Sequence, residues 1–146
     1  MTIPELTPAE AHDVLSRDSR ALYLDVRTES EFAAGHPAGA RNVPVVLFDP
    51  ASGGPKANPY FLDVVERNVP RDAKLIVGCQ SGGRSMRACE LLRDAGFADV
   101  TNVRGGFGGV HDRSGRVVEA GWADAGLPVE SGQPPGTSYA DLAGKR

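Results

Sequence analysis

Short apolar runs alternate with segments of helical spacing along most of the chain. Four runs predict strands of a buried sheet, because each is short, mainly apolar and bounded by charged residues, glycine or proline. These runs are Ala21–Arg27, a stretch within 39–48 in which Pro44 marks an edge, Lys74–Gly78 and a stretch within 98–106.

Four other segments carry helix signals. Thr7–Arg17 opens with a capping box, since Glu10 follows Thr7 by three positions and Pro8 takes the first helical position. The segment 28–35 repeats the threonine-to-glutamate spacing and ends at a glycine. The remaining two helices are predicted at 60–69 and 85–95. Strands that alternate with helices predict an α/β fold built on a parallel sheet.

Three segments fall outside this alternation. Residues 49–59 are rich in glycine and proline and predict a surface loop, which could shape access to a nearby site. Residues 110–130 hold a polar turn at Ser114 and Gly115 between short apolar pieces, which suggests a hairpin. From Gly132 the periodicity is lost. We therefore predict one domain over 1–131 and a flexible C-terminal tail over 132–146.

Composition narrows the class of protein. The chain has 40% hydrophobic and 24% charged residues, as ordinary globular proteins do, and lacks the roughly 20-residue apolar run of a membrane span. A net charge of −3 argues against non-specific nucleic-acid binding. Four arginines nevertheless cluster after residue 83, which suits a small anion: Arg84, Arg87, Arg93 and Arg104. Two cysteines and no recognisable signal peptide predict a reducing cytoplasm.

The stretch "LIVGCQSGGRS" at 75–85 allows two kinds of site. Its spacing approaches that of a phosphate-binding P-loop, but Arg84 stands where that loop needs a lysine ammonium. Alternatively, Cys79 ends a parallel strand ahead of a helix, where ligands bind in open α/β sheets. The loop from Gln80 to Gly83 contains small residues and no proline, so its backbone N–H groups can turn toward the sulfur. This pattern favours a reactive thiol over a buried, inert one.

Simple energetics indicate what such a thiol needs. A cysteine of ordinary pKa is only about 3% thiolate at pH 7, and lowering its pKa by about two units takes about 2.7 kcal/mol. A helix dipole supplies about 0.3–1 kcal/mol, whereas each hydrogen bond to a charged acceptor supplies about 1.5–3 kcal/mol. Converging amides must therefore provide most of the stabilisation of the Cys79 thiolate.

Three motifs in order resemble the rhodanese family of sulfurtransferases. The loop "CQSGGRS" resembles the family's active-site loop, and "LDVRTESEFAAGHPAGARNVP" at 24–44 is similar to its upstream motif. "VTNVRGGFGG" at 100–109 resembles its closing motif, and the likeness covers about residues 18–130.

The resemblance implies a fold and a reaction. The fold is a five-stranded parallel sheet flanked by helices, with Cys79 as the nucleophile. Thiosulfate, a small anionic donor, gives its outer sulfur to Cys79, and the persulfide passes that sulfur to cyanide or to a thiol, a protein thiol included. The residues expected to bind substrate are Gln80, Ser81, Gly82, Gly83, Arg84 and Ser85. No cofactor is implied, and His12 and His111 lack metal-ligand spacing.

Alternatives remain within this resemblance. A non-catalytic sulfur carrier or protein-docking domain could keep the same fold. Cysteine phosphatases use Cys-x5-Arg, whereas Cys79 and Arg84 form the shorter Cys-x4-Arg, which suits a single sulfur atom better than a phosphoryl group. The family's closing tryptophan is missing at its usual place, so we expect 111–121 to be an insertion and Trp122 to pack in its stead.

Four neighbouring residues are expected to be structural. Asp25 and Arg27 would tie loops near the site, and His36 would satisfy backbone groups in a turn. Cys89 would pack in the helix rather than form a disulfide with Cys79, which would need the two Cα atoms within about 7 Å.

Overall fold

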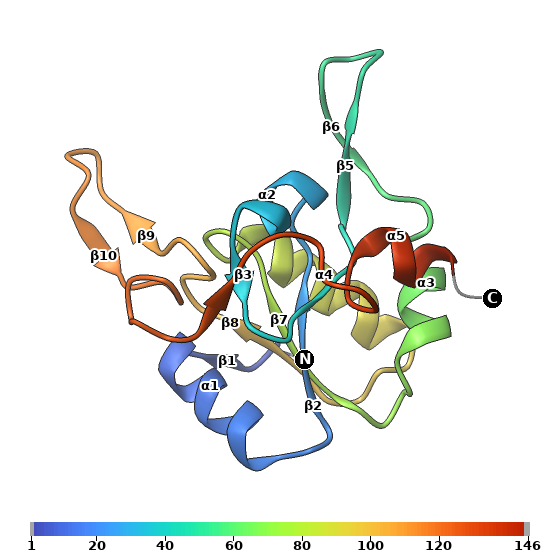
Figure 1. Cartoon of the computed structure of the whole chain (residues 1–146), viewed down its shortest axis with the longest axis horizontal. Coiled ribbons are helices and arrows are strands. Elements are labelled where there is room, and N and C mark those ends of the chain that lie inside the picture. The colour runs from blue at the N-terminus through green and yellow to red at the C-terminus, as the bar shows by residue number, and fades with distance from the viewer. Residues whose placement is uncertain (1, 145–146) are drawn as a thin grey trace.

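The computed structural model describes residues 2–144 and confirms the α/β fold class. Its central sheet has five parallel strands in the order β1-β8-β7-β2-β4 (Figure 1). Their bounds are β1 Glu5–Leu6, β2 Ala21–Asp25, β4 Arg41–Asn42, β7 Lys74–Gly78 and β8 Val100–Val103. Three of the four predicted strands pair in this sheet through their apolar runs, whereas the stretch within 39–48 pairs there through Arg41 and Asn42 and its Val46–Phe48 pair elsewhere. The two-residue strand β1 is the one that periodicity did not reveal.

Within residues 2–144, five helices accompany the sheet: α1 Pro8–Arg17, α2 Glu29–Ala34, α3 Phe61–Asn68, α4 Gly83–Asp94 and α5 Tyr139–Gly144. The capping boxes predicted at Thr7 and Thr28 are both formed. Helix α4 starts at Gly83, two residues earlier than expected, because Gly82 acts as its N-cap in the left-handed region at φ 118°.

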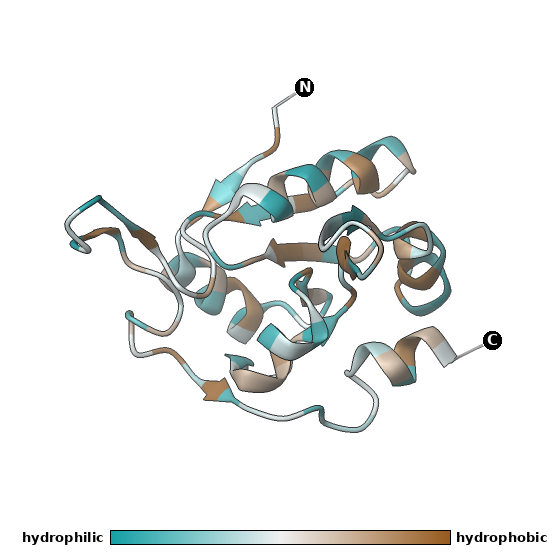
Figure 2. Ribbon diagram, turned by 90° about the horizontal axis from the view of Figure 1, so that it is seen from above, coloured by the Kyte–Doolittle hydropathy of each residue, from teal (hydrophilic) through white to brown (hydrophobic). Residues whose placement is uncertain are grey.

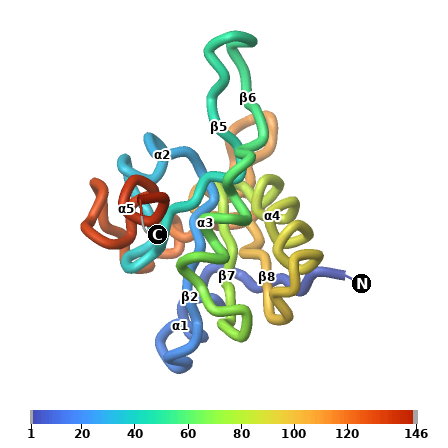
Figure 3. Tube along the Cα trace, turned by 90° about the vertical axis from the view of Figure 1, so that its right-hand side faces the viewer, coloured from blue at the N-terminus to red at the C-terminus, as the bar shows by residue number. Residues whose placement is uncertain are grey.

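The sheet separates two apolar clusters, as strand alternation requires. Leu75 and Val77 of β7 join the cluster under α3, α4 and α5, whereas Ile76 joins the cluster of α1 and α2. Figures 2 and 3 show the arrangement: apolar ribbon concentrates in the central strands, and α1 and α2 lie on the opposite side from α3 and α4. Cys79 has the same parity as Val77 and belongs to the α4 side.

Segment 110–130 forms the predicted hairpin and carries the expected tryptophan. Strands β9 Val110–His111 and β10 Val117–Glu119 pair antiparallel. Trp122 is fully buried, packs edge-on against Tyr23 and donates from Nε1 to Pro128 O at 2.7 Å. Trp122 therefore closes the cluster under α1 and α2, and its replacement of the family's tryptophan stays a prediction.

The glycine- and proline-rich loop is more regular than the sequence predicts. Val46–Asp49 (β5) and Gly54–Ala57 (β6) pair as an antiparallel hairpin that projects from the body of the domain (Figure 1). Its Phe48 is 66% exposed. Backbone pairing forms here without buried apolar alternation, so hydrophobic periodicity could not reveal it. A further short pair joins β3 His36–Pro37 to β11 Val129–Glu130.

The C-terminal segment also differs from the loose tail expected over 132–146. Thr137 O accepts from Asn42 N at 2.9 Å beside the edge strand β4, and α5 follows. Leu142 of α5 is buried in the core, and its carbonyl accepts from Asn68 Nδ2 at 2.9 Å. One anchoring leucine in a short helix is too little to produce a visible period. Met1 of the expected domain and residues 145–146 of the expected tail lie outside the described residues.

Candidate functional site

Cys79 lies at the carboxyl end of β7, where the chain turns into α4. Its side chain is buried at 2% exposure, and the N–H of Gly82 donates to its Sγ at 3.1 Å. The loop is closed by the glycine-rich closing motif: Phe107 N–H donates to Cys79 O at 2.8 Å, and Gly108 N–H donates to Gln80 O at 2.9 Å. Since a trans peptide points its N–H opposite to its C=O, these bonds direct the following amides away from the closing motif.

Gly106 fits against this loop because it has no side chain. Its φ is 56°, and a Cβ there would lie 2.3 Å from Cys79 O. The close approach of the two backbones is what allows the closing motif to fix the peptide orientations of the cysteine loop.

Ser85 supports the loop from beneath. It is fully buried, and its Oγ donates to Asn102 Oδ1, with Gly82 O as a second acceptor at 3.1 Å. Asn102 in turn donates to Glu5 Oε2 at 2.9 Å. The Ser85 side chain thus holds the turn at Gly82 rather than facing an open mouth, and Asn102 is a supporting residue that no local motif in the sequence indicates.

Arg84 is held by Glu31 of α2. Its Nη1 and Nη2 donate to the two carboxylate oxygens at 2.7 and 2.9 Å, a bidentate ion pair. These hydrogen bonds lower the pKa of Glu31 to about 2, and the capping-box bond from Thr28 adds to the effect. The same pair raises the pKa of Arg84. The sequence shows Glu31 as a helix cap, but its contact with Arg84 spans two distant segments and is seen only in the fold.

Asp25 and Arg27 form a buried pair beside the loop. Arg27 Nη2 donates to Asp25 Oδ2 at 2.8 Å and to Gly35 O at 2.7 Å, while its Nη1 donates to Gln80 Oε1 at 3.0 Å. The guanidinium also lies over the Phe107 ring, 4.5 Å from its centroid. Arg27 therefore fixes the Gln80 side chain and joins three loops, the structural role expected for this pair.

His36 and Cys89 likewise occupy structural positions. His36 is fully buried, with Nδ1 2.7 Å from Phe32 O and Nε2 3.0 Å from Glu130 Oε1. Cys89 is fully buried on α4, and burial raises the pKa of its thiol to about 12. A thiol in that state stays protonated and is a poor nucleophile.

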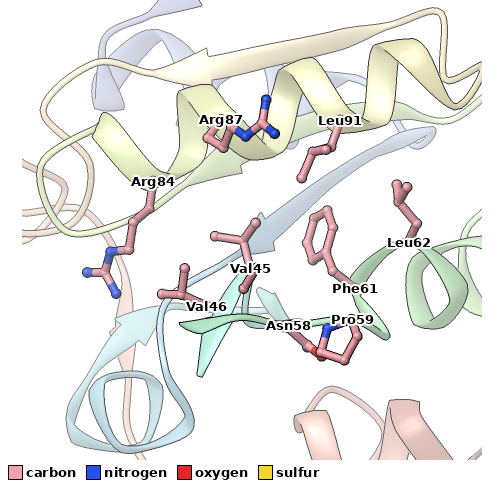
Figure 4. Close-up of a pocket in the computed structure, with 10 residues that line it drawn as sticks. Val45, Val46, Asn58, Pro59, Phe61, Leu62, Arg84, Arg87 and Leu91 are labelled. Carbon is pink, nitrogen blue, oxygen red and sulfur yellow. The ribbon is translucent and has the colours of Figure 1, made fainter. Parts of the chain in front are cut away.

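Within the described residues, a hollow of about 440 Å³ lies between Thr28, Arg84 and the β5–β6 hairpin, and two more lie beside the loop. One of about 520 Å³ is lined by Arg27, Glu31, Ala34, Gly35, Gln80, Phe107 and Val129. The other, of about 390 Å³, lies between α4 and the chain around β5 and α3 (Figure 4). It is lined by Val45, Val46, Ala57, Asn58, Pro59, Phe61, Leu62, Arg84, Arg87 and Leu91. Arg84 thus stands between the cysteine loop and this second hollow.

The fold and the site together define the class of protein. The family described as the rhodanese-like domain matches residues 7–113, and this chain belongs to that family. It is 40% identical over 121 residues to Thiosulfate sulfurtransferase 16, chloroplastic, of Arabidopsis thaliana, covering 83% of this chain and 88% of that protein. A sulfurtransferase activity in general is supported by this relationship.

Two further comparisons agree with the family. The chain is 40% identical over 108 residues to Senescence-associated protein DIN1 of Raphanus sativus, covering 74% of this chain and 51% of that protein. It therefore spans about half the length of that relative. The crystal structure of Rv0390 from M. tuberculosis superposes with a TM-score of 0.74 at 32% identity, covering 90% of this chain and 100% of the other.

Within residues 2–144, no group of three or more histidine, cysteine or acidic side chains is placed to hold a metal ion. No helix in that part of the chain is both long and apolar enough to cross a bilayer.

Proposed function

We propose that this chain transfers a sulfane sulfur from thiosulfate, or a similar small anionic donor, to cyanide or a thiol through a persulfide on Cys79. The observation that carries the proposal is the hydrogen bond from Gly82 N–H to Cys79 Sγ. The peptides that follow Cys79 and Gln80 in this loop are oriented by hydrogen bonds from Phe107 N–H and Gly108 N–H. An inert packing cysteine needs neither an amide donor nor a braced glycine loop.

The first half-reaction is a displacement at sulfur. The Cys79 thiolate attacks the outer sulfur of thiosulfate, the bond between the two donor sulfurs breaks, and sulfite leaves with the electron pair. The total charge is unchanged, and the new persulfide anion occupies the space at the loop. The Gly82 N–H stabilises negative charge on the sulfur, and further amides of Gln80 to Ser85 are proposed to hold the outer sulfur.

Arg84 is proposed to orient the anionic donor. Each terminal nitrogen of Arg84 donates one N–H to Glu31. The guanidinium has further N–H groups that can bind an incoming anion. Gln80 and Ser81 are proposed to line the entrance. Arg27 donates to the side-chain oxygen of Gln80, which fixes the orientation of that side-chain amide beside the loop.

The alternative is a sulfur-carrying or docking domain that turns over no small donor. Thiocyanate formation from thiosulfate and cyanide separates the two, with hydrolysis of an aryl phosphate measured on the same sample. We expect thiocyanate formation by the wild type, loss of about 10³-fold or more in Cys79→Ser and no phosphate release. Equal activity of wild type and Cys79→Ser, or a faster aryl-phosphate reaction, would overturn the proposal.

A cytoplasmic location is also a proposal, and it rests on the two free thiols. The Arabidopsis relative is named as chloroplastic, so cell fractionation with an antibody is the appropriate test.

A further inference from the structure

The hollow between α4 and the chain around β5 and α3 has one distinct chemical character. Most of its lining is aliphatic or aromatic, contributed by valines, leucines, a proline and Phe61. Its amide residue, Asn58, is already occupied: Nδ2 donates to Pro44 O and Tyr139 Oη, and Oδ1 accepts from Tyr60 N. The lining therefore offers mainly apolar contact, and the side-chain amide of Asn58 is not free to bind a ligand.

The charged residues of that lining are two arginines. Arg84 and Arg87 are three positions apart on α4, and Leu91 is four further on, so the three share one helix face. Figure 4 shows Leu91 directed toward Phe61 across the hollow, with both arginines on the same helix nearer the cysteine loop. The charged side chains that line the hollow are both cationic, although Glu31 outside the lining pairs with Arg84.

Arg87 is the more available of the two. Its side chain is 68% exposed, and its Nη1 lies 3.8 Å from Glu90 Oε1, which is longer than a hydrogen bond. Arg84, in contrast, is held in a bidentate pair with Glu31. An anionic group entering this hollow can therefore engage Arg87 without breaking a strong ion pair.

We infer that this hollow is the acceptor subsite, and that it takes a small thiol with an aliphatic stem and a terminal carboxylate. The inference rests on the proposed function for the reacting sulfur, and it adds the class of acceptor. The stem lies on Val45, Val46 and Phe61, the carboxylate pairs with Arg87, and the thiol end reaches past Arg84 to the loop. A volume of about 390 Å³ is at the small end of the range for ligand pockets.

The transfer step balances without any other reactant. The acceptor thiolate attacks the outer sulfur of the Cys79 persulfide, and a bond forms between those two sulfurs. The bond from the outer sulfur to Cys79 Sγ breaks, and its electron pair stays on Sγ. The products are an organic persulfide and the Cys79 thiolate, so the enzyme returns to its starting form.

The test uses protein loaded with sulfur beforehand and follows loss of the persulfide by mass spectrometry. The acceptors are mercaptopropionate, mercaptohexanoate and aminohexanethiol, compared at equal thiolate concentration. We expect the second-order rate constant to rise about threefold per added methylene in the carboxylate series. We expect the amine of the same length to react about tenfold more slowly, because its ammonium lacks the ion pair with Arg87 and is repelled by that guanidinium. Second-order rate constants that depend neither on the stem length nor on the terminal charge of the acceptor would overturn the inference.

Two variants locate the effect. Arg87→Gln should reduce the preference for the carboxylate over the amine by about threefold or more, and Leu91→Ala should flatten the dependence on stem length. The matched controls are Arg116→Gln, which removes an exposed arginine of the β9–β10 hairpin, and Val118→Ala, which shortens an exposed apolar side chain. Controls that change these preferences as much as the test variants would overturn the placement.

Binding of a compound with no thiol separates this inference from the proposed function. Titration of the protein with hexanoate and with hexylamine, followed by the NMR signals of the leucine methyl groups, should shift Leu62 and Leu91 with hexanoate alone. This readout does not depend on Cys79. If sulfur fails to load on Cys79 while hexanoate binds, the proposed reaction fails and the carboxylate-binding subsite stands. If sulfur loads but hexanoate causes no shift at Leu62 and Leu91, the subsite is refuted by itself.

Discussion

Replacing Gly106 by alanine should impair the cysteine loop without touching the sulfur. The added Cβ would lie 2.3 Å from Cys79 O and 2.9 Å from the carbonyl carbons of Cys79 and Gln80. Ordinary contacts begin at 3.4 Å, so the two backbones must separate by about 1 Å. That movement disturbs the bond from Phe107 N–H to Cys79 O, which orients the loop peptides.

The expected cost is mainly in the rate of sulfur loading. A displacement of about 1 Å in a reacting group lowers a rate by about 10²-fold, and we expect that loss in the pre-steady-state formation of the Cys79 persulfide. The left-handed φ of 56° adds about 1 kcal/mol of destabilisation in alanine. Quenched samples analysed by intact mass give the loading rate, and thermal unfolding gives the stability.

Two other glycines provide controls. Gly126 has φ 72°, and no heavy atom lies within 4 Å of the place where an alanine Cβ would stand, so Gly126→Ala carries the backbone cost without the clash. Gly108→Ala would place its Cβ 2.0 Å from Nε2 of the Gln80 side chain, which must shift against its bond from Arg27, so the loss of rate should be intermediate. If Gly106→Ala folds and loads sulfur as fast as Gly126→Ala, the closing motif does not set the geometry of the loop. If it does not fold, Gly108→Ala decides: a loading rate equal to that of Gly126→Ala refutes the reasoning.

Three further predictions concern the surroundings of the loop. Glu31→Gln removes the ion pair to Arg84 and should lower the free energy of unfolding. Because the pKa of Glu31 is depressed to about 2, the pair stabilises the fold above about pH 4.5, and this contribution is lost as the pH falls toward 2. The shift corresponds to at most about 3 kcal/mol, which partial exposure reduces to about 1–2 kcal/mol, and urea unfolding of both proteins at several pH values should show the difference disappear in acid. Cys89→Ser should load sulfur as the wild type does, with a loss of about 1–3 kcal/mol in unfolding free energy from the buried hydroxyl; a large loss of loading would assign Cys89 a chemical role. Exchange of residues 49–59 for a short glycine-serine link should change the apparent KM for the acceptor more than single-turnover loading, and equal effects on both would contradict a role in acceptor access.

The sequence predicts well what is encoded locally. The capping boxes at Thr7 and Thr28 and the strand at 74–78 are formed as expected, because each depends on residues a few positions apart. The loop from Cys79 to Ser85 could be recognised for the same reason. Strand β1 and helix α5 were not predicted, since two paired residues and one anchoring leucine leave no period in the sequence.

The partners of the site residues could not be predicted. Arg84 was expected to bind substrate, but its partner Glu31 lies 53 positions away in the sequence, and only the packing of α2 near α4 brings the two together. Ser85 was expected to bind substrate through its backbone amide, which stays a prediction, and the bond from its hydroxyl to Asn102 could not be foreseen. Several backbone amides were expected to donate to Cys79 Sγ. The N–H of Gly82 does so, and the contribution of the other loop amides stays a prediction.

Cys79 as the carrier of the transferred sulfur is the claim on which the remaining steps depend. Intact mass after treatment with thiosulfate and removal of excess donor measures it directly, with Cys79→Ser and Cys89→Ser treated alongside. The account predicts a gain of one sulfur atom by the wild type and by Cys89→Ser, and none by Cys79→Ser. A gain that persists in Cys79→Ser, or that disappears in Cys89→Ser alone, would contradict it.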